Sequence, residues 1–184
     1  MNEENIQQAV KNLLLTLDHD FERPDLKDTP RRSAKAYIKL LEGYSRSLNE
    51  EMTIFPNDDN YDGMIYSGEI NFFSTCEHHL LPFFGTAHVA YIPNGRISGL
   101  SKLSRAVDIF SRRFQQQERI TMQIADALDS LLEPKGVAVL LEGHHLCHAA
   151  RGAQQVNSKM KTMAFRGVFK EDTSVRNEFF NLIK

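Results

Sequence analysis

Residues 83–100 read FFGTAHVAYIPNGRISGL, and this stretch decides the fold class. Phe83 to Ile92 is rich in aromatic and aliphatic side chains bounded by turn residues, which predicts a long strand. Asn94-Gly95 is a strong signal for a tight turn, so we expect a hairpin leading into Arg96 to Leu100. The stretch therefore predicts antiparallel strands at the centre of the fold.

Further strands are expected on both sides of this stretch. Met64 to Tyr66 and Ile70 to Phe73 are short β-rich runs that follow a polar loop at Asn57 to Asp62. Val137 to Leu141 is a continuous apolar run, typical of a buried strand, and we expect this strand to continue toward Cys147.

Helices are predicted before, between and after the strands. Thr29-Pro30 is typical of a helix start, with Thr29 as the N-cap, and Ser101 can cap another helix. Apolar residues at helical spacing mark the helices: Ile6, Val10, Leu13, Leu14 and Leu17; Ala34, Tyr37, Ile38 and Leu41; Leu103, Val107 and Phe110; Ile120, Ile124, Leu128 and Leu131; Val175, Phe179, Phe180 and Ile183. The predicted class is α+β, with a helical N-terminal arm at residues 1–50 and a second unit at residues 51–184.

Composition limits the classes of function. The 184 residues carry a formal net charge of −2, which argues against a nucleic-acid-binding surface. The N-terminus lacks the pattern of a signal peptide, and apolar runs fall short of the ~18 residues of a membrane helix. Cytosolic thiols stay reduced, so we expect a cytoplasmic protein whose two cysteines serve metal binding or catalysis rather than a disulfide.

Two Cys-His pairs predict a metal site. Cys76 is followed by His78 and His79, and His145 precedes Cys147 by two positions, which places both on one side of an extended strand. Spacing leaves the ligand set open among these five residues. Four ligands would make a structural zinc site, whereas three would leave room for a water molecule. The alternative to a metal site is two buried, reduced cysteines with histidines scattered near them, but chance explains two Cys-His pairs poorly.

Five motifs, in this order, resemble those of the GTP cyclohydrolase I family: Cys76-Glu77-His78-His79, Gly99 to Arg105, Gln117-Glu118-Arg119, His145-Leu146-Cys147 and Ala150-Arg151-Gly152. The resemblance covers the chain from Thr29 onward. It implies a T-fold, in which five antiparallel sheets backed by helices form a barrel and two barrels stack into a homodecamer with active sites between subunits. The implied reaction converts GTP to 7,8-dihydroneopterin triphosphate and formate, the first step of pterin and tetrahydrofolate biosynthesis.

The resemblance also selects among the metal candidates. Carbon 8 of guanine is a weak electrophile, and a zinc ion with an open position lowers the pKa of bound water from 15.7 to about 7. By motif, Cys76, His79 and Cys147 match the zinc ligands, which leaves that position open. His78 and His145 match the acid–base histidines, a task suited to the pKa of histidine.

The remaining motif residues match substrate contacts. Gln117 and Glu118 match residues that read the guanine edge, where a carboxylate can accept from the ring N1–H and the 2-amino group. A carboxylate is also common at a helix N-terminus for dipole reasons alone. The triphosphate is assigned to Lys102, Arg105 and Arg151, with Arg32 and Lys35, and Ser101 is placed among the catalytic residues near the ribose.

The two cations Lys102 and Arg105 are expected in the first turn of a helix, where an anion would bind; solvated charges are the alternative. Phe114, Gln116 and His148 depart from the usual family pattern, as does the stretch Ser158 to Arg166, which is poorer in threonine. Two other functions remain open: a related T-fold cyclohydrolase that stops at a ring-opened product, and a non-catalytic zinc or nucleotide-binding module with a closed metal site.

Overall fold

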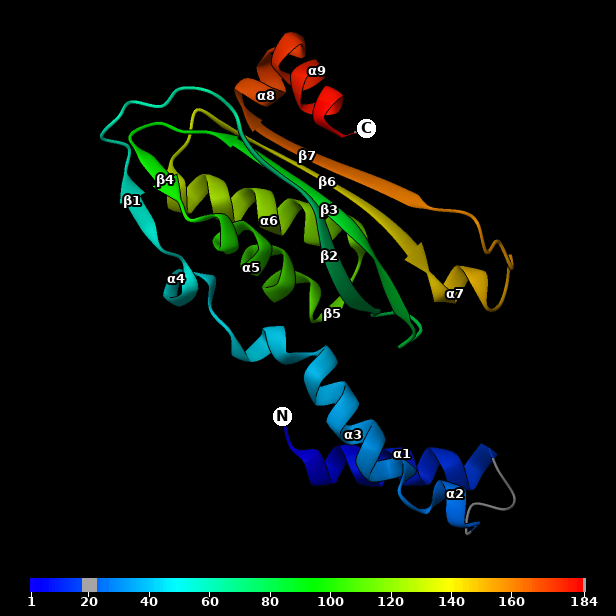
Figure 1. The fold of residues 1–184 in the computed structure, drawn as a ribbon. Helices are drawn as coiled ribbons and strands as arrows, with labels where there is room; N and C mark the ends of the chain where they lie inside the picture. The colour runs from blue at the N-terminus through cyan, green and yellow to red at the C-terminus, as the bar shows by residue number, and fades with distance from the viewer. Residues whose placement is uncertain (18–22, 184) are drawn as a thin grey trace.

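The computed structural model describes residues 1–17 and 23–183, and its centre is a five-stranded sheet with the strand order β5-β2-β3-β6-β7 (Figure 1). The strands are β2 Ile65–Cys76, β3 Pro82–Ile92, β5 Phe114–Gln115, β6 Gly136–His145 and β7 Met160–Gly167. Neighbouring strands pair antiparallel, except for the short parallel pairing of β2 with β5. A separate two-stranded sheet joins β1 Ile54–Pro56 to β4 Arg96–Ser98.

Helices cover both faces of the large sheet, which confirms the predicted α+β class (Figure 1). The first face packs against α5 Leu100–Ser111 and α6 Gln117–Leu132, and the second against α8 Val168–Glu171 and α9 Thr173–Leu182. The remaining helices are α1 Glu3–Leu17, α2 Pro24–Lys27, α3 Thr29–Leu40, the 3-10 turn η1 Glu42–Ser45, α4 Leu48–Glu51 and α7 Leu146–Ala149.

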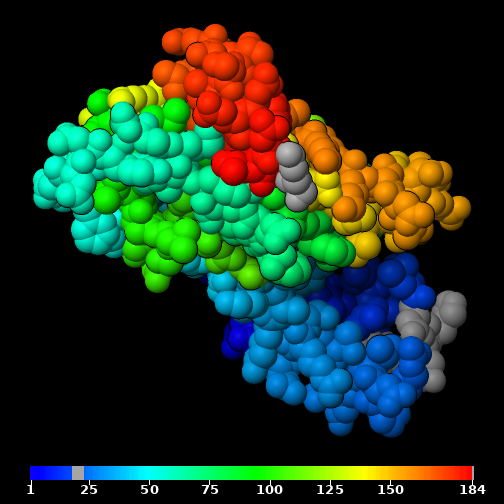
Figure 2. Space-filling view, turned by 45° about the horizontal axis from the view of Figure 1, so that its top comes forward, coloured from blue at the N-terminus to red at the C-terminus, as the bar shows by residue number. Residues whose placement is uncertain are grey.

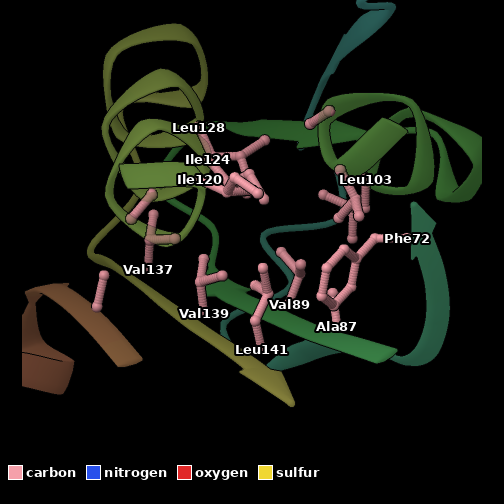
Figure 3. Packing of buried hydrophobic residues seen from close by; sticks show 14 of the residues in the cluster. Phe72, Ala87, Val89, Leu103, Ile120, Ile124, Leu128, Val137, Val139 and Leu141 are labelled. Carbon is pink, nitrogen blue, oxygen red and sulfur yellow. The ribbon is translucent and has the colours of Figure 1, made fainter. Parts of the chain in front are cut away.

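The main core lies between the sheet and the helices α5 and α6 (Figure 3). Alternate strand residues such as Val89 and Val139 point toward Ile120, Ile124 and Leu128 of α6, and all five side chains are fully buried. Burial of one such side chain contributes about 1.5–3 kcal/mol, so this layer fixes which face of each strand is inside.

The N-terminal helices form an arm that projects from the sheet body (Figures 1 and 2). Helix α1 packs mainly against α3, and its residues remain exposed or half-buried, with Leu13, Leu15 and Leu17 more than half exposed. The helices predicted here are confirmed, but Thr29 is not the N-cap of α3: the helix begins at Thr29 and Asp28 occupies the N-cap. Part of the predicted loop between them, residues 18–22, lies outside the described residues.

The predicted hairpin at Asn94-Gly95 is wrong. Gly95 does adopt a positive φ of 78°, as a turn requires, but the strands on its two sides belong to different sheets. β3 pairs with β2 and β6, whereas β4 pairs with β1 through the register Phe55↔Ile97. Pro93 lacks the N–H that would continue a ladder, so the chain leaves the large sheet there.

Two local expectations also change. The two predicted β-rich runs, apart from Met64, belong to the single strand β2, which begins at Ile65 and whose register shifts between Ser67 and Ile70 at a β-bulge. Ser101 does not cap α5, because the helix begins at Leu100 and Gly99 occupies the N-cap. Within residues 1–17 and 23–183, no helix has the length and apolar character needed to cross a membrane.

The buried His88 gives the fold a pH dependence. Its Nδ1 lies 2.7 Å from the Tyr66 hydroxyl, and burial lowers the pKa of His88 below its usual value, opposed by the charges of Glu69 and Glu142. An unfolded histidine titrates near about 6.5. As the pH falls, the unfolded chain therefore takes up the proton before the folded chain does. The stability that the neutral ring contributes is complete above the unfolded pKa of about 6.5 and is lost as the pH falls below it.

We expect denaturant unfolding to show a larger loss of unfolding free energy between pH 7.5 and 5.5 for the native chain than for His88→Gln. The difference is limited to about 1.4 kcal/mol per pH unit for one proton. Tyr66→Phe keeps the imidazole and should keep the pH dependence while lowering stability. Equal pH dependence in the native chain and His88→Gln would contradict this account.

Candidate functional site

Two thiols and an imidazole converge where β2 ends. Cys76 is the last residue of β2, and a tight turn follows in which the Cys76 N–H donates to Leu81 O at 2.9 Å and the Leu80 N–H donates to Cys76 O at 2.9 Å. The turn places His79 back beside Cys76, with His79 Nδ1 3.5 Å from the Cys76 sulfur. Cys147 approaches from α7, and the ligand atoms of Cys76, His79 and Cys147 all lie within 4.8 Å of one another.

The chemistry of this donor set fits zinc. Zinc is commonly bound by cysteine sulfur and histidine nitrogen, and three protein ligands are typical of a catalytic site. Burial raises the pKa of the Cys147 thiol, and the neighbouring Cys76 thiol raises it further. A metal ion bound here would displace those protons, since thiolates are the binding form. The three residues therefore form a candidate metal site.

The position of Cys147 corrects one prediction. β6 ends at His145, so His145 and Cys147 do not share one face of an extended strand. Instead, the single turn of α7 directs Cys147 toward Cys76. His145, the last residue of β6, remains beside the metal residues because it pairs with Phe83 of the neighbouring strand β3. Both residues thus reach the same site by a different backbone path.

A cavity of about 210 Å³ opens beside these residues. Its lining consists of Cys76, His78, His79, Phe83, Gln115, Gln116, Gln117, Glu118, His145 and Cys147. The cavity therefore brings together the three predicted metal ligands, both predicted acid–base histidines and both residues predicted to read guanine.

His145 is held on two sides. Its ring stacks on Phe83, with the ring centroids 4.5 Å apart and an angle of 8° between the planes. Its Nε2 lies 2.9 Å from the side-chain oxygen of Gln117. Burial lowers the pKa of His145, which the negative charge of Glu118 opposes. The ring thus has one defined orientation in the cavity wall.

His78 is more exposed and belongs to a polar cluster that sequence reasoning missed. The Gln116 amide nitrogen donates to Glu77 at 2.8 Å and lies 3.2 Å from His78 Nε2. The Arg119 guanidinium pairs with Glu77 and lowers the pKa of that carboxyl group. In the sequence, Gln116 stands out only as a departure from the family pattern, and no spacing rule connects it to residues as distant as Glu77 and His78.

The predicted phosphate residues lie outside this cavity. Ser101 and Lys102 are in the first turn of α5, whereas Arg105 is in the second turn, one turn later than predicted, and lies 3.4 Å from Glu51. Arg151 follows α7 and is exposed.

Two further predicted phosphate residues belong to the arm. Arg32 and Lys35 are exposed on α3, and Arg32 lies 3.8 Å from Asp28. One chain therefore brings together the residues predicted to bind metal and guanine, whereas the predicted phosphate residues on α5 and α3 lie apart from them.

Removal of one ligand should separate metal binding from the neighbouring histidine. We expect Cys147→Ser to lose zinc. Its zinc affinity should fall by more than the roughly 10–100-fold that is typical when a residue hydrogen bonded to a metal ligand is removed. His145→Ala should retain about one zinc per chain, because three ligands remain. Metal analysis after dialysis measures both. Loss of zinc from His145→Ala would show that His145 is a ligand.

Known proteins resemble this chain over its whole length. The solved structure of the archaeosine synthase QueF-Like in the apo form covers 56% of this chain and 93% of that chain, with a TM-score of 0.46 and 16% identity, a likeness too limited to inform the site. "GTP cyclohydrolase 1 2" of Nostoc sp. is 48% identical over 186 residues, covering 100% of this chain and 85% of that protein. "GTP cyclohydrolase 1" of Deinococcus radiodurans is 47% identical over 185 residues, with the same coverage.

"GTP cyclohydrolase 1" of Brucella canis is 48% identical over 179 residues, covering 97% of this chain and 84% of that protein. The GTP cyclohydrolase I family matches residues 6–184. The family expected from five short motifs is thereby confirmed along nearly the entire sequence: this chain belongs to the GTP cyclohydrolase I family.

Proposed function

We propose that Cys76, His79 and Cys147 bind Zn²⁺ and that the adjoining cavity converts GTP to 7,8-dihydroneopterin triphosphate and formate. The chain is a hydrolase, a GTP cyclohydrolase of the pterin and folate pathway, and its subunit has the T-fold. The observation that carries the residue assignment is the convergence of a three-ligand metal set with two further histidines and a carboxylate in one cavity. The two cysteines must stay reduced to bind metal, so we place the enzyme in the cytoplasm.

Zinc held by three protein ligands would activate a water molecule for attack on carbon 8 of guanine. The chain's own residues then manage protons and position. His145 and His78 line the cavity on different elements, so one can take a proton while the other gives one to the ring nitrogen as the carbon–nitrogen bond breaks. The Phe83 ring excludes water from one face of His145.

Glu118 is the residue best placed to bind the guanine edge. It is exposed at the cavity and begins the first turn of α6 with Gln117. Its carboxylate can accept from the N1–H and the 2-amino group together. The Gln117 amide, in contrast, is hydrogen bonded within the protein. We therefore assign guanine recognition mainly to Glu118.

We also propose that the triphosphate is bound across a subunit interface. α5 rises about 1.5 Å per residue, so Lys102 lies on the order of 15 Å from the C-terminal end of α5, after which the chain leads to the cavity residues Gln115 to Glu118. A second copy of the chain can supply Lys102 and Arg105 where one chain cannot. Exposed apolar side chains on the sheet, including Phe73 and Met163, support association. The proposed assembly is a homodecamer of two stacked pentamers.

Two observations weigh against the alternatives. A closed metal site would need a fourth ligand, yet the ligand group that converges within 4.8 Å among the described residues consists of Cys76, His79 and Cys147, without His145. A reaction that stops after ring opening would need fewer proton carriers, and both His78 and His145 are present. We also propose that residues 1–50 act as an arm on the catalytic unit 51–184.

The reaction is tested by incubating the zinc-loaded protein with GTP. We expect equimolar formate and a product with dihydropterin absorbance, and we expect both to disappear in His145→Ala. Formate without the pterin would favour the ring-opening cyclohydrolase. No formate from a protein that contains zinc would refute the proposed activity.

The shared site is tested with hybrid oligomers. Cys147→Ser removes one of the three proposed metal ligands, and Lys102→Ala removes a proposed phosphate contact. Each variant alone should therefore have little activity at low GTP concentration. If neighbouring subunits complete each site, refolding an equal mixture should restore intact sites at roughly a quarter of positions. Separately refolded variants that are then combined serve as the control. A mixture no more active than its components would place the whole site in one chain.

A further inference from the structure

The side chain of Gln117 is buried and fully hydrogen bonded. It is 1% exposed, and its amide nitrogen lies 3.1 Å from Leu141 O, 3.0 Å from Met160 O and 3.1 Å from the Thr162 hydroxyl. Its amide oxygen faces His145 Nε2 at 2.9 Å. One residue of α6 thus connects β6 and β7 to a histidine of the cavity.

These partners determine which way the amide points. Backbone carbonyls only accept hydrogen bonds, so the nitrogen must face Leu141 and Met160. The Thr121 hydroxyl donates to the Gln117 carbonyl at 2.8 Å, and it lies 2.6 Å from the Thr162 hydroxyl. Because the hydrogen of Thr121 is already used, Thr162 donates to Thr121, and the two amide hydrogens of Gln117 are shared among Leu141 O, Met160 O and the Thr162 oxygen. A flipped amide would set its oxygen against two carbonyl oxygens.

The orientation of Gln117 fixes the proton on His145. An amide oxygen only accepts, so His145 Nε2 must carry a hydrogen. In the neutral ring, Nδ1 then carries the lone pair. Within the described part of the chain, Nδ1 has no protein hydrogen-bond partner, which leaves it available to a substrate.

We propose that Gln117 is a positioning residue that fixes His145 in the tautomer with hydrogen on Nε2, so that Nδ1 exchanges protons with the substrate. The inference rests on the proposed function and adds a role that the motif did not assign, since the motif placed Gln117 at the guanine edge. The two roles predict different kinetics. Loss of guanine recognition raises KM, whereas loss of the tautomer lowers kcat.

The fold reserves space for this contact. Gly143 of β6 lies beneath the amide, and a Cβ atom built on it would be 2.4 Å from Gln117 Oε1 and 3.2 Å from Phe72. An alanine at this position would therefore displace the amide from His145 while leaving Gln117 chemically intact. Gly143→Ala is thus an independent way to break the same hydrogen bond.

The test begins with steady-state kinetics of zinc-loaded Gln117→Met, which keeps the side-chain length and removes the amide. We expect kcat to fall by at least about tenfold, up to the roughly 10⁴-fold that a positioned acid–base group can contribute. The KM for GTP should change by less than about threefold, because ground-state binding of GTP is unaltered. Zinc content should match the native enzyme. Gly143→Ala should reproduce the fall in kcat.

Gln123→Met is the matched control, because Gln123 is a half-buried glutamine of the same helix whose oxygen accepts from Gln115 at 2.7 Å. Its kcat should stay within about twofold of the native value. If Gln117→Met fails to fold, Gly143→Ala decides alone. A rise in KM with unchanged kcat in Gln117→Met would overturn the inference in favour of guanine recognition.

A spectroscopic readout tests the tautomer without activity. In zinc-loaded protein labelled with [15N]histidine, the His145 signals are assigned by their loss in His145→Gln. We expect Nε2 to show a directly bound hydrogen in the native protein, and the two tautomers to mix in Gln117→Met. A hydrogen found on Nδ1 in the native protein refutes the inference even if formate is released. A native protein that releases no formate would instead refute the proposed function.

Discussion

The simultaneous pairing of β3 with β2 and β6 is the constraint on which the site depends. Its register places Pro82 beside Thr75 and Phe83 beside both Ser74 and His145. Because side chains alternate across a strand, a slip of one residue would bury the wrong face and separate Cys76 from His145. The buried layer of Val89, Val139 and the α6 side chains holds this register. Packing far from the metal residues therefore fixes their relative position.

Gln117 and His145 rest on a helix and a strand, whereas His78 and His79 lie in the turn after β2. Gln117 lies in the first turn of a helix that is anchored by its buried face, and its amide joins β6, β7 and His145. Leaving a buried donor or acceptor without a partner costs about 1–3 kcal/mol, so this network admits one arrangement. Such rigidity suits proton transfer, which tolerates small positional errors poorly.

The chain separates its functions in space. The residues proposed to bind metal and guanine gather at one end of the sheet, whereas most of the cations proposed to bind phosphate lie on the N-terminal part of α5 and on the arm; Arg151, which follows α7, is the exception. The exposed apolar residues of α1 and of the sheet are the features that the proposed assembly would cover. Oligomerisation and catalysis are linked in this proposal, because a complete site needs cations that one subunit does not bring to the cavity.

Sequence alone determined the family, the α+β class and most helices, and its motifs singled out Cys76, His79 and Cys147 as the candidate metal ligands, because these depend on local patterns and on short motifs. It failed where distant partners decide: Asn94-Gly95 predicted a hairpin, but β4 pairs with β1, and Cys147 was placed on a strand that ends at His145. Only the tertiary structure revealed that Gln117 orients His145 and that Gln116 joins Glu77 to His78. Both contacts connect residues 28 or more positions apart, and their hydrogen bonds depend on packing geometry that no sequence period encodes.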